Sequence, residues 1–315
     1  MTNILLLGGS GFIGSNIASY FINKNFNIII LDMECANFSN LTDIENITIY
    51  KGSIGDEGLL KTIFTENLID IVINLVTTIL PGNELLNVEN DISNNLFLMI
   101  RLLDVMNEFN VNKIIFFSSG GTVYGKSTDG LNSETHETEP INLYGWIKLS
   151  IEKYIQMYSN LNKMNYLIVR PSNPYGRHQN IFGKQGIIAV ALGRIIKNEP
   201  LIIWGDGKII RDYIYIDDLC NALYLLIKNE KWNQVYNIGS GIGVSINELL
   251  TIIKEVTRKS ITIDYQKPRN VDVEINILDI SKLKLDVDFH ISTDIFTGIT
   301  SMWSMLQQGV SNELK

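Results

Sequence analysis

A chain of 315 residues, of which 45% are hydrophobic and 19% charged, can bury one large core or two smaller ones. The net charge is −8 at pH 7, and Lys and Arg are scattered rather than clustered, which argues against a nucleic-acid-binding surface. The two cysteines, Cys35 and Cys220, and the three histidines are dispersed, so their spacing predicts no metal site. No apolar run approaches the roughly 18 residues of a membrane helix, and residues 1–31 lack the basic segment of a signal peptide. We therefore expect a cytoplasmic protein with no membrane or nucleic-acid partner.

The first half of the chain alternates short β-rich segments with helical patterns, which is typical of a parallel sheet covered on both faces. The predicted strands cover residues 3–7, 27–31, 47–50, 69–75, 113–117 and 166–170, and the helical stretches between them lie near 12–23, 57–66, 86–109 and 143–160. Because crossovers between parallel strands are right-handed, this order predicts an α/β fold with a Rossmann-type doubly wound parallel sheet.

The alternation of strand and helix patterns ends at Arg170, where the turn-rich segment RPSNPYG begins. Helical patterns follow near 185–198, 217–228 and 245–258, mixed with short strands. We predict a first domain over 1–172 and a smaller mixed α/β domain, formed mainly by 173–315, that binds the substrate. The β-rich segment 209–216 is expected to return to the first domain, which would then be rejoined by about 209–238.

The segment NILLLGGSGFIG at the start of the chain places a strand, a glycine turn and the start of a helix in immediate succession. Glycine allows a tight turn and lets backbone N–H groups approach a pyrophosphate at the positive end of a helix. The segment therefore predicts a dinucleotide site. The predicted contacts are Gly8, Gly11, Phe12, Ile13 and Gly14.

Asp32 lies at the end of the second predicted strand, where a carboxylate can accept hydrogen bonds from the adenosine ribose hydroxyls. The same carboxylate would repel a 2′-phosphate, and no arginine follows it closely. These features favour NAD(H) as the cofactor and leave NADP(H) as the second option.

Tyr144 and Lys148 are four residues apart, so both side chains lie on one face of the predicted helix. A phenol has an unperturbed pKa of about 10, and a neighbouring cation stabilises its phenolate. Beside a nicotinamide, such a tyrosine can take or give a hydroxyl proton while hydride moves at the same carbon. A tyrosine and a lysine at this spacing are common on helix surfaces, so the prediction depends on the motifs around them.

Together, six motifs in this order resemble the extended short-chain dehydrogenase/reductase family, in particular its nucleotide-sugar epimerases, dehydratases and 4-ketoreductases. They are GGSGFIG (8–14), SSGGTVYG (118–125), YGWIK (144–148), RPSNPYG (170–176), WGDGKIIRDYIYIDD (204–218) and YNIGSG (236–241). The resemblance runs from residue 3 to about 280. It implies an NAD(P)-binding domain followed by a smaller domain for a nucleotide-diphosphate sugar.

The resemblance also implies roles for residues of the second half. Asn173 would hold the substrate diphosphate or sugar, and Arg211 and Arg269 would pair with phosphates, a task that suits planar guanidinium groups. The helices near 86–109 and 143–160 would form a four-helix dimer interface, so a homodimer is expected.

The loop after the fifth strand departs from the family pattern. Family members carry a Ser or Thr three residues before Val-Tyr-Gly, and here that position is Gly120. The nearest hydroxyls belong to Ser119 and Thr122. Thr122 is slightly favoured, because alternate residues of an extended loop face the same side. Two further departures, Ser53 and the segment 74–78, bear on cofactor affinity.

Several functions fit these motifs. The preferred one is a 4-ketoreductase that reduces a dTDP-4-keto-6-deoxyhexose with NAD(P)H, in the synthesis of sugars for surface polysaccharides such as lipopolysaccharide. The alternative is a 4-epimerase of a UDP-hexose, of the glucose or N-acetylglucosamine type, with tightly bound NAD. The absence of a hydroxyl at Gly120 tilts the choice toward the reductase, whose carbonyl substrate is already electrophilic. A 4,6-dehydratase is disfavoured because Gly121-Thr122 supplies no acid–base pair, and the intact Tyr144 and Lys148 argue against a non-catalytic NAD-binding regulator.

Overall fold

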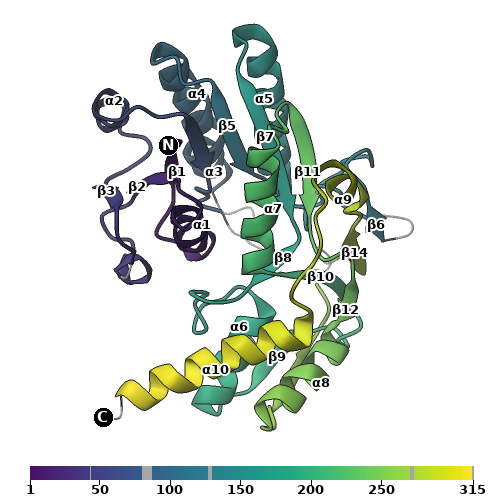
Figure 1. Ribbon diagram of the computed structural model, residues 1–315. Helices are drawn as coiled ribbons and strands as arrows, with labels where there is room; N and C mark the ends of the chain where they lie inside the picture. The colour runs from purple at the N-terminus through teal and green to yellow at the C-terminus, as the bar shows by residue number, and fades with distance from the viewer. Residues whose placement is uncertain (43, 80–86, 127–129, 270–272, 314–315) are drawn as a thin grey trace. The chain divides into compact units, whose positions relative to one another are not determined.

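The computed structural model describes residues 1–42, 44–79, 87–126, 130–269 and 273–313 (Figure 1). These residues form two compact units, each built from several stretches of the chain. The first unit comprises 1–125, 137–170 and 223–236, and the second comprises 126–136, 171–222 and 237–315. In the part of the chain described, no helix is long and apolar enough to cross a membrane.

A seven-stranded sheet forms the centre of the first unit. Its strand order is β11-β7-β5-β4-β1-β2-β3, and the pairs from β7 through β5, β4, β1 and β2 to β3 are parallel. The strands are β1 (Asn3–Leu7), β2 (Asn27–Asp32), β3 (Ile47–Lys51), β4 (Ile71–Asn74), β5 (Lys113–Phe117), β7 (Asn165–Pro171) and β11 (Gln234–Ile238). The predicted doubly wound parallel sheet is therefore confirmed, with β11 as a seventh strand beyond the six predicted.

Helices cover this sheet. The apolar side chains of α2, α4 and α5 join those of β1, β2, β4, β5 and β7 in one continuous core cluster. A separate aromatic group includes Phe21 of α1, whose ring contacts the Phe26 ring and, edge-on, the Tyr224 ring of α7. The helices are α1 (Phe12–Ile22), α2 (Glu57–Glu66), α3 (Val88–Ile92), α4 (Leu98–Glu108), α5 (Leu143–Asn162) and α7 (Ile216–Lys228), with a 3₁₀ turn at Ser39–Leu41 and a π-helical turn at Ser93–Phe97.

The second unit contains a five-stranded sheet of order β12-β10-β14-β6, with β8 also paired to β10, and a two-stranded sheet, β13-β9. Buried Asp212 on β10 accepts hydrogen bonds from the backbone N–H groups of Ser240 (2.8 Å) and Gly241 (3.1 Å), which holds the YNIGSG turn. The elements are β6 (Leu131–Asn132), β8 (Asn173–Tyr175), β9 (Leu201–Trp204), β10 (Ile210–Tyr215), β12 (Gly243–Ser245), β13 (Ile263–Gln266), β14 (Ile275–Leu278), α6 (Ile187–Lys197), α8 (Ile246–Thr257), α9 (Ser281–Val287) and α10 (Ile295–Glu313).

The division into units differs in detail from the boundary expected near residue 172. The chain enters the second unit after Arg170, and the segment 209–216 stays there, because β10 pairs with β8, β12 and β14 of the same unit. The return to the first unit covers 223–236, and the short stretch 126–136 belongs to the second unit.

Candidate active site

The glycine turn between β1 and α1 leaves little room for side chains. Gly8 has φ +78°, a conformation that residues with a Cβ rarely adopt. A Cβ on Gly14 would lie 2.6 Å from the Gly8 carbonyl oxygen and from the Gly9 Cα. Gly11 is the N-cap of α1 and has no side chain to cap the helix, so the N–H groups from Phe12 and Ile13 onward mark an open helix end. This arrangement fits a pyrophosphate.

Asp32 connects the second strand to this turn. One carboxylate oxygen accepts from the backbone N–H (3.0 Å) and the hydroxyl (2.5 Å) of Ser10, and the other accepts from the backbone N–H of Met33 (2.8 Å). Ser10, which the motif comparison did not single out, thus fixes the carboxylate beside the glycine turn. A carboxylate has about four acceptor positions, so Asp32 keeps capacity for a ribose hydroxyl.

Tyr144 and Lys148 lie at the start of α5, one turn apart. Asn142 caps the helix by accepting from the Gly145 N–H (2.8 Å). The Lys148 ammonium donates to the Phe117 carbonyl (2.9 Å) and lies 5.7 Å from the centre of the Tyr144 ring. The carboxyl end of β5 therefore fixes the position of the lysine beneath the tyrosine.

Burial shifts the pKa of both groups, because it disfavours the charged form of each. Lys148 is 4% exposed, and burial lowers its pKa to about 8, against the opposing effect of the nearby Glu152 carboxylate. Burial raises the pKa of the Tyr144 phenol to about 12, against the opposing effect of a hydrogen bond with the Ser119 hydroxyl. In the protein alone, the phenol is therefore a protonated group with a hydroxyl partner and a lysine close by.

The two candidate hydroxyls have different surroundings. Ser119 hydrogen-bonds the Tyr144 hydroxyl, whereas the Thr122 hydroxyl is buried and has no partner among the described residues. The loop is not extended here: the N–H groups of Thr122 (3.4 Å) and Val123 (3.2 Å) both point to the Ser119 carbonyl, as in a helical turn. Alternate residues therefore do not share a side, and the reason for favouring Thr122 does not apply.

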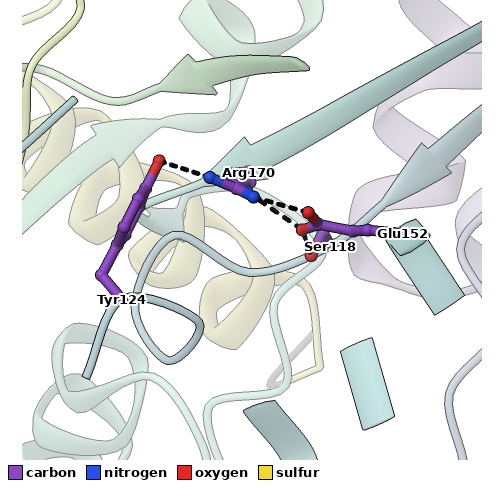
Figure 2. A network of polar contacts seen from close by, with 4 residues as sticks. All are labelled: Ser118, Tyr124, Glu152 and Arg170. Carbon is purple, nitrogen blue, oxygen red and sulfur yellow. Dashed lines mark hydrogen bonds and ion pairs between the residues drawn. The ribbon is translucent and has the colours of Figure 1, made fainter. Parts of the chain in front are cut away.

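A buried polar network lies directly beyond Lys148 along α5 (Figure 2). The Glu152 carboxylate accepts from Arg170 Nε (3.0 Å) and Nη2 (2.6 Å) and from the Ser118 hydroxyl. Arg170 Nη1 donates to the Tyr124 hydroxyl (2.9 Å). None of these four residues was predicted as functional. The signal in the sequence was the four-residue spacing of Tyr144, Lys148 and Glu152, which places an acidic residue on the same helix face.

The two segments that depart from the family pattern form local hydrogen bonds. The Asn74 side chain accepts from the Val76 N–H (2.9 Å), and Asn95 accepts from the Thr78 N–H (3.1 Å) and donates to its hydroxyl (2.8 Å). The Ser53 hydroxyl accepts from the Gly55 N–H (3.0 Å) in a turn. Asn95 lies in the π-helical turn, a feature frequent at functional sites.

The predicted phosphate ligands belong to the second unit. Asn173, which begins β8, donates to the Asp212 carbonyl (2.8 Å), and Arg211 on β10 donates to the Ile210 carbonyl (2.9 Å). The Arg269 guanidinium lies 5.7 Å from the centre of the Trp204 ring. The described residues contain no cluster of three or more His, Cys, Asp or Glu that could hold a metal ion.

Comparisons by family, by sequence and by structure all match this chain to the same group of proteins. The model of the NAD dependent epimerase/dehydratase family matches residues 4–239. A protein of Methanocaldococcus jannaschii, provisionally named a UDP-glucose 4-epimerase, is 36% identical over 281 residues, 89% of this chain and 90% of its own. The dTDP-4-dehydro-6-deoxyglucose reductase of Escherichia coli is 31% identical over 303 residues, 95% of this chain and 96% of its own. The crystal structure of the Thermotoga maritima UDP-glucose 4-epimerase with UDP-glucose superposes with a TM-score of 0.91 at 30% identity, over 98% of this chain and 100% of that one.

Proposed function

We propose, from the premise that the chain belongs to the NAD-dependent epimerase/dehydratase family, that it interconverts the two C4 epimers of a UDP-hexose. The chain is an NAD-dependent enzyme of the extended short-chain dehydrogenase/reductase type. The sequence alone favours a 4-ketoreductase and keeps the epimerase as its alternative. The relatives support that alternative better: the Methanocaldococcus jannaschii protein, provisionally named a UDP-glucose 4-epimerase, is 36% identical, and the Thermotoga maritima UDP-glucose 4-epimerase has a TM-score of 0.91.

The first unit offers residues that fit NAD. Gly8, Gly11 and Gly14 leave the approach to the N-terminus of α1 free of side chains, and Asp32 is held where it can meet a ribose. Bound NAD supplies the hydride acceptor for the sugar carbon and, in its reduced form, the hydride donor.

Tyr144 is the group that takes the proton from the C4 hydroxyl and later returns it. A phenol with a pKa of about 12 is protonated at neutral pH, so it holds the proton to be donated and must lose it before it can act as a base. The Ser119 hydrogen bond favours the phenolate, and so does a positive charge such as the Lys148 ammonium, 5.7 Å from the ring centre. These effects oppose the burial, which still leaves the pKa of Tyr144 at about 12 in the protein alone.

The hydrogen bond between Ser119 and Tyr144 is the observation that carries the proposal. The preference for a reductase rested on a missing hydroxyl at Gly120, because proton removal from an alcohol needs a relay to the tyrosine more than carbonyl reduction does. Ser119 supplies a hydroxyl at that tyrosine from the adjacent position, so this objection to an epimerase falls away.

Reduction of a dTDP-4-keto-6-deoxyhexose is the second candidate. It is supported by the similarity to the Escherichia coli reductase over nearly the whole length of both chains. The same Tyr144 would then act once, as the acid that protonates the new hydroxyl.

The second unit would bind the sugar nucleotide. We assign the diphosphate to Arg211 and Arg269 and the diphosphate or sugar to Asn173. The Trp204 face beside Arg269 is a further flat, exposed surface that suits stacking of the base.

We also propose a homodimer formed through α4 and α5. These helices pack against each other in the first unit, and α5 exposes Met157 and Leu161 one turn apart. Exposed apolar side chains that share one helix face are typical of an interface.

Incubation with candidate substrates tests the reaction. The purified protein is expected to convert UDP-glucose or UDP-N-acetylglucosamine to its C4 epimer without added reductant, as read by NMR of the sugar. Stoichiometric consumption of NADH or NADPH with dTDP-4-keto-6-deoxyglucose, and no epimer of either UDP-sugar, would assign the reductase instead. Tyr144→Phe is expected to abolish turnover; a variant with undiminished turnover would contradict the role of Tyr144 in both reactions.

A further inference from the structure

Glu152 continues the line of functional side chains along α5. It lies one turn after Lys148 and two turns after Tyr144, and it is fully buried, with 0% exposure. A carboxylate in such a place is costly unless every acceptor position finds a donor. Here Arg170 on β7 supplies two donors and Ser118 supplies a third.

The stability of the fold does not explain this pair. Replacing a buried ion pair with apolar side chains of similar volume is often neutral or stabilising, because removing two charges from water is expensive. The position of the pair offers a better explanation. Ser118 follows the end of β5 and Arg170 lies near the end of β7, so Glu152 joins α5 to two neighbouring strands at their carboxyl ends.

The network holds both ends of the loop that carries Ser119. At its start, Ser118 donates to Glu152; at its end, the Tyr124 hydroxyl accepts from Arg170. Figure 2 shows Arg170 between Tyr124 on one side and Glu152 with Ser118 on the other. The middle of the loop contains Gly120 and Gly121, and glycine gives the backbone more freedom than any other residue. Fixing the ends of a loop of this composition therefore restricts the conformations that its middle can adopt.

The negative charge of Glu152 also acts on the Lys148 ammonium. The groups around the ammonium are the Tyr144 phenol and the Glu152 carboxylate on its own helix, and the Phe117 carbonyl on β5; Arg170 on β7 reaches Glu152 from the other side. Burial lowers the pKa of Lys148, and the charge of Glu152 partly offsets that effect.

We propose that Glu152 is a positioning residue: together with Arg170 it clamps the loop 118–124 onto α5, and so keeps the Ser119 hydroxyl on Tyr144. This inference rests on the roles proposed above for Tyr144, Lys148 and Ser119.

Glu152→Gln tests the clamp, since it keeps the volume and removes the charge. The variant is expected to lower kcat of the C4 epimerisation about 10- to 100-fold, the size of loss that a misplacement of about 1 Å produces. KM for the UDP-sugar should stay within about threefold, because the phosphate-binding residues are elsewhere. Glu199→Gln is the matched control: it removes the same charge from an ion pair with Arg194 in which Glu199 is 44% exposed, and should leave kcat unchanged.

A double-mutant cycle separates positioning from a general effect on the fold. If Glu152 acts by holding Ser119, then Glu152→Gln should cost less than about threefold in kcat when Ser119 is already Ala. Losses that multiply independently would overturn the proposal, and so would a folded Glu152→Gln enzyme with the kcat of the wild type. If Glu152→Gln does not fold, Ser118→Ala and Tyr124→Phe, which keep the ion pair, enter the same cycle with the same criteria.

A measurement without substrate distinguishes this proposal from the proposed reaction. The ¹³Cζ resonance of Tyr144, assigned with Tyr144→Phe, reports the hydrogen bond at the phenol oxygen. Glu152→Gln should move this resonance in the same direction as Ser119→Ala does, whichever sugar nucleotide is the substrate. A resonance that Ser119→Ala moves and Glu152→Gln leaves in place would overturn the clamp alone. An active Tyr144→Phe enzyme would instead overturn the proposed function.

Discussion

Ser119 and Thr122 lie in one loop, but their hydroxyls have opposite surroundings: the first hydrogen-bonds Tyr144, and the second is buried with no partner among the described residues. We expect Ser119→Ala to lower kcat roughly 10- to 100-fold, the range set by one hydrogen bond to a charged group. Thr122→Val keeps the shape and removes the unpaired hydroxyl, so the free energy of unfolding should stay equal or rise by up to about 1 kcal/mol. Steady-state kinetics and urea unfolding of both variants check this. A larger loss of kcat in Thr122→Val than in Ser119→Ala would reverse the assignment.

Lys148 adds a pH dependence to stability. Its pKa in the folded protein is about 8, below the usual 10.5, so between these values the unfolded chain binds more protons than the folded one. Stability from this group therefore rises with pH through that window. From pH 7.5 to 9.5 the wild type should gain up to about 2 kcal/mol in free energy of unfolding relative to Lys148→Met, at 1.36 kcal/mol per pH unit above pH 8. Urea unfolding without cofactor measures it, and an unchanged difference between the two proteins would contradict the buried charge.

Gly145 shows how α5 is placed at the scale of the element. A Cβ there would lie 2.7 Å from the Thr122 carbonyl oxygen and 2.9 Å from the Pro140 Cβ. Gly145→Ala improves helix propensity by about 1 kcal/mol, but the contact with a backbone oxygen outweighs this gain. We expect a lower melting temperature and a lower kcat, since α5 must move away from the loop. Ser150→Ala, in the same helix, is the control and should not reduce either; a Gly145→Ala enzyme as stable as this control would contradict the close contact.

The elements themselves were largely predictable. The strands β1 to β5 and β7 follow from short β-rich runs, and the glycine motif placed the first turn correctly, because both signals are local. The seventh strand was missed, since β11 lies far along the chain from β7, its neighbour in the sheet. The clamp was missed for a similar reason: Tyr124 and Arg170 stand in two separate motifs and Glu152 in a third segment, and the three meet only through tertiary packing. The hydroxyl at Tyr144 depended on whether the loop is extended or turned, which spacing does not determine.

For the whole molecule, the exposed face of α5 makes a prediction about assembly. Leu161 is 74% exposed and lies one turn after exposed Met157, as expected of an uncovered interface. We expect the wild type to be a dimer by light scattering, and Leu161→Glu to give monomers, because a charge in an apolar interface is costly. Leu285→Glu is the control, since Leu285 is 86% exposed on α9 of the other unit. A monomeric wild type, or an unaffected Leu161→Glu dimer, would contradict an interface at this face.

The discontinuous division of the chain has a consequence for its synthesis. The strand β11, at one edge of the first unit's sheet, comes from residues 234–238, after the second unit's stretches 126–136 and 171–222 have been made. Because domains fold as units while the chain emerges from the ribosome, the first unit cannot complete its sheet until about three quarters of the polypeptide is available. For the same reason, exchanging the second unit with that of a relative by recombination would require three separate segments to be transferred together, at junctions near residues 126, 136, 171, 222 and 237.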